Sequence, residues 1–177
     1  MQAEAQEIID AFPDWLHAAY GGGMAAKLGL EEFGEPDWVL LTDLLELMHQ
    51  HEADHTLTFR RLSELADDRP DDAPVGEIFT LPDAFDDWLE RWERRLDEDG
   101  RPRSEIADQM REVNPIIVAR NHRVEAAIED AVERSDFETF HTLADVLAEP
   151  YEFPDEHPEL LEPPAPDERV EATFCGT

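Results

Sequence analysis

The sequence has very little cysteine, lysine and serine, and the first two scarcities already narrow the possible functions. Cys175 is the only cysteine among 177 residues, so no disulfide can form within the chain and a reducing, cytoplasmic environment is expected. Lys27 is the only lysine, and 14 basic residues stand against 45 acidic ones, which gives a net charge of -31 at pH 7. Because such a charge repels nucleic acids and anionic membranes, we expect neither as a partner.

Residues 1–7 are acidic and do not resemble a signal peptide, and no apolar run approaches the length of a membrane-spanning helix. We therefore expect a soluble protein. The acidity fits either a disordered acidic chain or a folded protein that stays hydrated in concentrated salt. Four tryptophans and nine phenylalanines, recurring at helical spacing, favour the folded, salt-adapted interpretation.

Apolar residues recur every three or four positions along most of the chain, which predicts an all-α fold. No segment alternates apolar and polar residues for long enough to predict a strand. The first helix is expected to bend or restart at Pro13, and the glycines at 21–23 are expected to form a turn. The predicted helices cover residues 8–20, 37–48, 54–65, 83–99, 104–113, 121–134 and 136–148.

A chain of this length with 41% hydrophobic residues is expected to form one helical domain, over residues 1–149. Pro150 closes the last helix, and five further prolines predict an extended arm over residues 150–177. The last two helices each have one face that is expected to be buried. These faces comprise Val124, Ala127, Ile128, Ala131 and Val132 in the first helix, and Phe137, Phe140, Leu143 and Leu147 in the second.

Residues 51–55, His-Glu-Ala-Asp-His, match the H-E-x-x-H pattern. On one helix this pattern directs two imidazoles toward a zinc ion, with the glutamate as general base. Asp54 is a good helix cap, however, and a helix that began there would separate His51 from His55. No third ligand is indicated by spacing, so a zinc hydrolase is a remote alternative and we nominate no metal ligand.

Other catalytic patterns are not found. The three serines lie outside any Gly-x-Ser-x-Gly motif, and the glycines at 21–23 lack the strand and the following Lys of a phosphate-binding loop. No carboxylate pair stands out among 45 acidic residues. We therefore nominate no catalytic and no cofactor-binding residue.

Two further segments each allow two interpretations. Residues 120–123, Arg-Asn-His-Arg, are unusual in an acidic chain and would suit a phosphate group. The interpretation we favour is structural: Asn121 caps a helix while Arg120 and Arg123 pair with carboxylates. Cys175 is either a redox-active thiol or an unreactive one, because reactivity depends on a pKa that the sequence does not show.

Several segments share an ordered pattern with a known family. They are Met24–Leu30 (Met-x-x-Lys-Leu-Gly-Leu), Asp54–Leu62 (Asp-x-Thr-x-Thr-Phe-Arg-x-Leu), Phe85–Trp88 (Phe-x-x-Trp), Met110–Pro115 (Met-x-x-x-Asn-Pro) followed by Arg120, Asn121 and His122, and Phe174–Thr177. Together they resemble the C-terminal part of the SelO (YdiU) protein adenylyltransferases. Some members of that family carry selenocysteine at the position of Cys175.

The resemblance implies the helical part of a protein-kinase-like fold that binds ATP and transfers AMP to protein hydroxyls with Mg²⁺ or Mn²⁺. In that family the nucleotide- and metal-binding residues lie upstream of the matched segments, and no motif of that core occurs here. The chain is therefore expected to be inactive alone and to need an upstream kinase-like core, in cis or in trans, to act on protein substrates.

The resemblance also implies roles for single residues. Asn114, Pro115, Arg120, Asn121 and His122 are expected to be structural, and a redox role of Cys175 is expected only in trans, with a cysteine of the upstream core. The alternative to this whole interpretation is a stand-alone, all-α interaction module.

Overall fold

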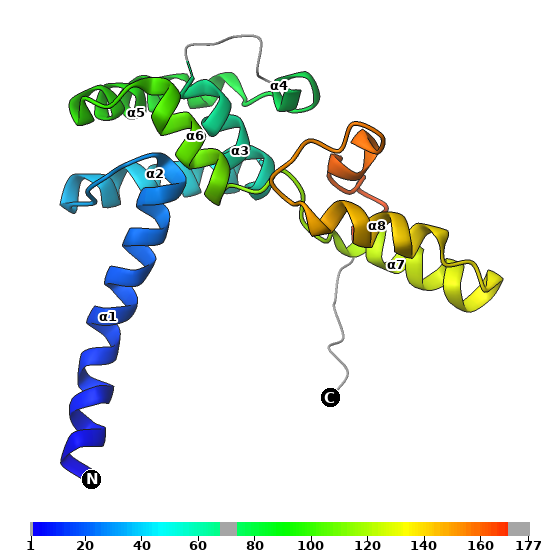
Figure 1. Ribbon diagram of the computed structural model, residues 1–177. Coiled ribbons are helices and arrows are strands. Elements are labelled where there is room, and N and C mark those ends of the chain that lie inside the picture. Colours follow the sequence, from blue (N-terminus) through cyan, green and yellow to red (C-terminus); the bar gives the residue numbers. More distant parts are fainter. Residues whose placement is uncertain (1, 68–73, 170–177) are drawn as a thin grey trace. The chain divides into compact units, whose positions relative to one another are not determined.

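The structure, a computed structural model, describes residues 2–67 and 74–169 of the chain (Figure 1). The described residues form helices joined by turns and contain no strand, so the all-α prediction is confirmed. The elements are α1 (Gln2–Leu28), α2 (Glu35–Gln50), α3 (His55–Leu65), α4 (Pro74–Ile78), η1 (Asp83–Phe85), α5 (Asp86–Asp99), α6 (Arg103–Val113), α7 (Asn121–Glu129), η2 (Asp130–Arg134), α8 (Glu138–Ala148) and η3 (Pro158–Leu161).

The chain divides into two compact units, Met1–Asn114 and Pro115–Thr177. Within the second unit α7 packs against α8, and the amides of Ile116 and Ile117 both donate to the carbonyl oxygen of Pro150. Residues on either side of Pro150 therefore belong to one unit. The division seen in the structure thus differs from the boundary that the sequence suggested between residues 149 and 150.

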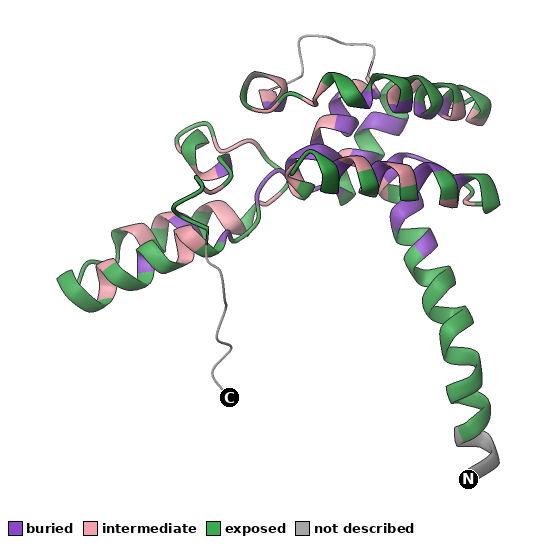
Figure 2. Ribbon diagram, turned by 180° about the vertical axis from the view of Figure 1, so that it is seen from behind, coloured by how far each residue is buried: buried purple, intermediate pink, exposed green. Residues whose placement is uncertain are grey.

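The core of the first unit lies between α2, α3, α5, α6 and the C-terminal end of α1 (Figure 2). Trp88 and Trp92 of α5 are almost fully buried, and their rings stack with centroids 5.9 Å apart. Each indole N–H has a partner, because Trp88 donates to the carbonyl of Leu40 at 2.8 Å and Trp92 to that of Leu28 at 2.9 Å. The two rings thereby fill the core without leaving a buried donor unpaired.

Helix α1 is continuous through Pro13 and through the glycines at 21–23, so the predicted turn at these glycines is wrong. The reason lies in tertiary packing. A Cβ atom at Gly21 would lie 3.1 Å from the ring of Trp38 and 3.3 Å from that of Phe33, so the missing side chain lets these rings approach the helix. Gly21 therefore allows the two rings to pack close to α1 and does not change the direction of the chain.

Most helix ends follow local signals in the sequence. Asp54 caps α3 by accepting a hydrogen bond from the amide of Leu57 at 2.9 Å, as predicted. Gly100 ends α5 with a φ of 77°, and α6 ends before Asn114 and Pro115. The helix predicted over residues 121–134 is present, but its last turn, η2, is a π-helix.

The second unit departs from the sequence prediction in its burial. The faces of α7 and α8 that were expected to be buried are largely open, with Ile128, Val132, Phe137 and Phe140 all at least half exposed. Two helices that pack against each other cover only part of their apolar faces, and the periodicity alone does not show whether a third element covers the rest. The predicted arm begins with turns and η3, whose Leu161 is fully buried.

Candidate functional site

Four polar side chains of the first unit, from α1, α3 and the residue after α6, meet in one largely buried cluster, which we call the polar junction: Lys27, Arg60, Ser63 and Asn114. Lys27 lies in the last turn of α1, Arg60 and Ser63 lie on α3, and Asn114 directly follows α6. The junction therefore joins helix segments that are up to 87 positions apart in the sequence.

Asn114 lies at the centre of the junction and is fully buried. Its side-chain amide donates to the carbonyl oxygen of Lys27 at 2.9 Å and to the hydroxyl of Ser63 at 3.0 Å. Its Oδ1 accepts a hydrogen bond from the ammonium of Lys27 at 3.1 Å. An aspartate would fill the same space but could donate neither hydrogen bond, so these contacts require an amide side chain.

Arg60 closes the C-terminal end of α6. Its guanidinium donates to the carbonyl oxygens of Arg111 and Asn114, each at 3.2 Å. Carbonyl groups in the last turn of a helix have no intrahelical partner and carry partial negative charge, so a cation is favourable there. Burial nevertheless lowers the pKa of Arg60, because the charged form loses solvation.

Lys27 is held by two acceptors and by an aromatic ring. Its ammonium donates to Asn114 and to the carbonyl of Val113 at 3.3 Å, and it lies 5.3 Å from the centre of the Phe59 ring. Burial lowers the pKa of Lys27. The pKa of neighbouring His55 is lowered as well, first by burial and then by the positive charge of Lys27.

Gly29 ends α1 beside the polar junction with a φ of 75°. A Cβ atom there would lie 2.6 Å from Ile106 and 2.7 Å from the sulfur of Met110, so α6 approaches too closely for any side chain. The carbonyl of Gly29 accepts a hydrogen bond from Arg101 at 2.9 Å, and the amide of Leu30 donates to Ala25 at 2.9 Å. The Lys-Leu-Gly segment thus acts as a helix terminus.

The chemistry of the polar junction is structural. Its two cations contact carbonyl and amide oxygens, and across residues 2–67 and 74–169 no three His, Cys, Asp or Glu side chains gather as metal ligands. Sequence reasoning did not foresee the roles of Lys27, Arg60 and Ser63, and the only signals were the single lysine and the shared motifs.

The H-E-x-x-H segment does not form the arrangement that a zinc hydrolase needs. His51 follows the end of α2, Glu52 has a φ of 49°, and His55 is the first residue of α3. The two imidazoles therefore do not lie on one continuous helix. Instead, the ring of His51 lies 6.1 Å from that of Phe85, and the ring of His55 lies 4.8 Å from that of Phe59.

Residues 120–123 belong to the second unit and hold η3 against α7. Arg120 donates to the carbonyl of Leu161 at 3.1 Å, and Arg123 to that of Glu159 at 2.7 Å. The prediction that Asn121 caps α7 is wrong, because the N-cap is Arg120 and Asn121 is the first helical residue. The prediction for Arg123 also needs correction, since its partner is a carbonyl and not a carboxylate.

His122 and Cys175 complete the set of predicted residues. His122 is half-buried, its Nε2 has no hydrogen-bond partner among the described residues, and burial lowers its pKa, as does the charge of Arg123. Cys175 lies outside the described residues, together with the rest of the terminal Phe-Cys-Gly-Thr segment, so its redox role stays a prediction.

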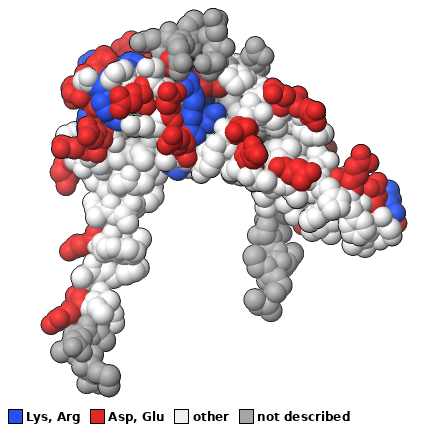
Figure 3. All heavy atoms as spheres, in the orientation of Figure 1, with Lys and Arg blue, Asp and Glu red and all other residues white. Residues whose placement is uncertain are grey.

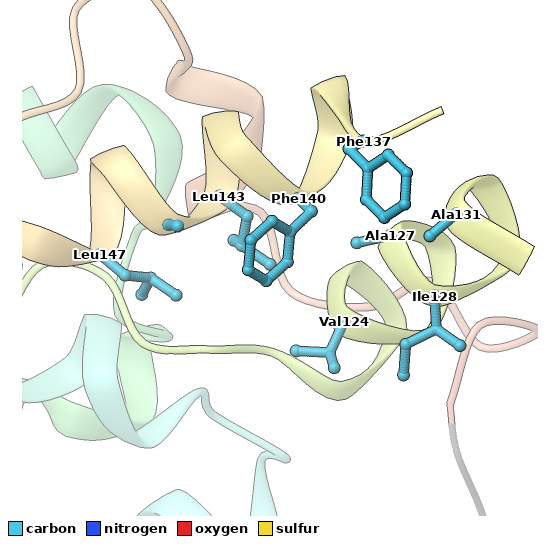
Figure 4. A pocket seen from close by; sticks show the side chains of 9 residues that line it. Val124, Ala127, Ile128, Ala131, Phe137, Phe140, Leu143 and Leu147 are labelled. Carbon is cyan, nitrogen blue, oxygen red and sulfur yellow. The ribbon is translucent and has the colours of Figure 1, made fainter. Parts of the chain in front are cut away.

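An apolar groove of about 410 Å³ lies between α7 and α8 (Figure 4). Figure 4 shows the side chains of Phe137 and Phe140 on one side and those of Val124 and Ile128 on the other. Of the residues that the structure describes, no charged one lines this groove. It offers packing for an apolar group and no polar group for catalysis.

The comparisons with known proteins point to the same family as the motifs that contribute to the polar junction. The family model described as protein adenylyltransferase SelO matches residues 1–148. The chain belongs to the SelO family. Three residues of the polar junction, Lys27, Arg60 and Asn114, each come from a different one of the segments that resemble the SelO pattern, and Ser63 directly follows one of these segments.

Curated SelO relatives carry the name protein nucleotidyltransferase YdiU. The relative from Nitrobacter winogradskyi is 47% identical over 173 residues, which are 98% of this chain and 34% of that protein. The relative from Rhizobium etli is 46% identical over 174 residues, or 98% of this chain and 35% of that protein. The chain therefore spans about a third of the length of the curated relatives it matches. Among the described helices, none has the length and apolar character needed to cross a membrane.

Proposed function

We propose that this chain forms a helical part of a SelO-type protein adenylyltransferase, which transfers AMP from ATP to hydroxyl groups of protein substrates. The family match over residues 1–148 supports the assignment. The observation that carries it is the polar junction, in which residues of three family motifs bond to one another. These bonds hold three helix segments together. A chain that shares the motifs with the SelO family is therefore expected to share this helical scaffold as well.

The same proposal assigns ATP and Mg²⁺ or Mn²⁺ to the remainder of the enzyme, in cis or in trans. Nucleotide transfer depends on metal-held phosphates and a positioned base, and no group of three or more His, Cys, Asp or Glu side chains gathers as metal ligands among the described residues, which supports this division. The relatives are about three times as long as this chain, which leaves room for a separate catalytic core. The role of this chain is then to complete and stabilise the enzyme and not to touch the nucleotide.

We assign the protein to a cytoplasm that contains concentrated salt. Its net charge of -31 and its single lysine support this assignment. A folded surface with so many carboxylates repels itself, and dissolved cations screen that repulsion.

Transfer of labelled AMP tests the proposed function. The first sample is the purified chain with ATP, Mg²⁺ or Mn²⁺ and a protein substrate mixture, and we expect no labelled protein. The second is a chimera in which this chain replaces the matching third of the Nitrobacter relative, and we expect labelling to appear. AMP transfer by the chain alone would contradict the assigned division of labour, and a folded but inactive chimera would contradict the family role.

The second candidate is a stand-alone interaction module. The buried core of the first unit and the apolar groove of the second favour it, since a folded scaffold with an open groove suits a binding protein. A cooperative melt of a monomer, together with a chimera that gains no activity, would favour this candidate over the first.

A further inference from the structure

The N-terminal half of α1 makes almost no contact with the core of its own unit. Every residue from 6 to 20 is exposed, as the outer part of the helix in Figure 2 shows. Large apolar side chains are among them: Ile8 is 71% exposed, Ile9 62%, Phe12 52%, Trp15 65% and Leu16 51%. We call these five residues the α1 stripe.

The α1 stripe forms one face of the helix. At 3.6 residues per turn, spacings of three and four place its members within less than half of the circumference. The rings of Phe12 and Trp15 lie 6.0 Å apart along it. Glu7, Asp10 and Asp14 lie on the remaining surface, and Figure 3 shows this half of α1 as mostly uncharged with a few carboxylates. The helix is therefore amphipathic, although none of the described residues of its own unit covers its apolar face.

Helix propensity does not account for this segment. A short helix without tertiary packing is marginal in water, because its stability comes mainly from the burial of an apolar face. Pro13 removes one main-chain donor from the helix interior, and the glycines at 21–23 weaken it further. The segment therefore needs a surface to pack against in its working state.

The length of the relatives indicates which part of the protein supplies that surface. The family match begins at residue 1 and so includes the α1 stripe, yet about two thirds of each curated relative lies outside the match. A second copy of this chain is a poorer occupant, because each copy brings a net charge of -31. We propose that the α1 stripe is the docking surface for the remaining two thirds of a SelO-family protein; this inference rests on the proposed function.

Hydrogen exchange of the α1 amides in the chain alone and in the Nitrobacter chimera tests the docking. Amides of an unpacked helix open easily, so in the chain alone residues 8–16, which precede the contacts of His17 and Tyr20 with Trp38, are expected to exchange fast. In the chimera the same amides are expected to exchange at least about tenfold more slowly, because packing suppresses local opening. Equal rates in the two proteins would overturn the proposal.

Variants on two faces of α1 separate docking from folding. Phe12→Asp and Trp15→Asp place a charge in the α1 stripe and are expected to abolish the slow exchange in the chimera. Ala18→Asp adds the same charge away from the stripe and is expected to preserve it. Because all three positions are exposed, urea unfolding of the first unit in the chain alone is expected to stay unchanged. Protection that survives both stripe variants would overturn the proposal.

Two further readouts keep this inference separate from the proposed function. A chimera with protected α1 amides but no AMP transfer would refute the proposed function and support the docking surface. A chimera that transfers AMP while its α1 amides stay unprotected would support the proposed function and refute the docking surface. Sedimentation of the chain alone is expected to give a monomer, and a dimer with protected α1 amides would overturn the choice of occupant.

Discussion

Replacement of Asn114 by alanine is expected to destabilise the first unit by about 3 kcal/mol, from three side-chain hydrogen bonds at about 1 kcal/mol each. These are the bonds that Asn114 donates to Lys27 and Ser63 and the bond that it accepts from the ammonium of Lys27. The substitution also leaves the carbonyl of Lys27 without this donor in a partly buried place. The loss therefore belongs among the larger effects of a single substitution.

Urea unfolding followed by tryptophan fluorescence measures this loss. All four tryptophans lie in the first unit, so the signal reports that unit and not α7 and α8. Gln50→Ala is the matched control, because it removes an exposed side-chain amide that bonds only Glu46 within α2. We expect a change of less than about 0.5 kcal/mol for the control. A loss below about 1 kcal/mol for Asn114→Ala, or one equal to the control, would refute the role of the polar junction.

Three further predictions concern the same unit. Gly29→Ala is expected to lower the free energy of unfolding in urea by about 2 kcal/mol or more, because a Cβ would lie 2.6 Å from Ile106 at a φ of 75°. Gly22→Ala has open space around the added Cβ and is expected to raise the free energy of unfolding by up to about 1 kcal/mol. Equal effects of the two would contradict this. Since the pKa of His55 is lowered from 6.5 by burial, the unfolded chain binds the proton more tightly, so the unfolding free energy should fall as pH falls below 6.5. His55→Gln should flatten that slope, and an unchanged slope would contradict the assignment. Raising KCl from about 0.1 M to about 1 M, which shortens the Debye length from about 10 Å to about 3 Å, should raise the urea midpoint because it screens the net charge of -31. A flat response would show that carboxylate repulsion does not limit stability.

Helix positions and ends were predictable where the signal is local. The caps at Asp54 and Gly100 and the stop at Asn114 depend on residues within one turn, and each lies where the sequence placed it. The role of Gly21 was misjudged because this glycine lies against Trp38, a ring from another helix. A local pattern carries no information about that neighbour.

The candidate site was predictable only in part, for a similar reason. The shared motifs identified the family, and they marked Asn114 as structural. The partners of Asn114 remained unknown, because Lys27 and Ser63 are 87 and 51 positions away. Periodicity marked apolar faces on α1, α7 and α8 but did not show that they are open, since exposure depends on what else the protein contains.

The polar junction and the α1 stripe are two ends of one helix, and this links the scaffold to the proposed docking. Lys27 and Gly29 fix the C-terminal end of α1 to α3 and α6, so the direction of the helix is set before its N-terminal half meets a partner. A surface that is already oriented loses less entropy on docking. Asn114→Ala is therefore expected to weaken the protection of the α1 amides in the chimera although it lies outside the α1 stripe, while Gln50→Ala is expected to leave that protection unchanged. If Asn114→Ala destabilises the first unit but leaves the α1 protection intact, the helix direction is set by the partner and not by the junction.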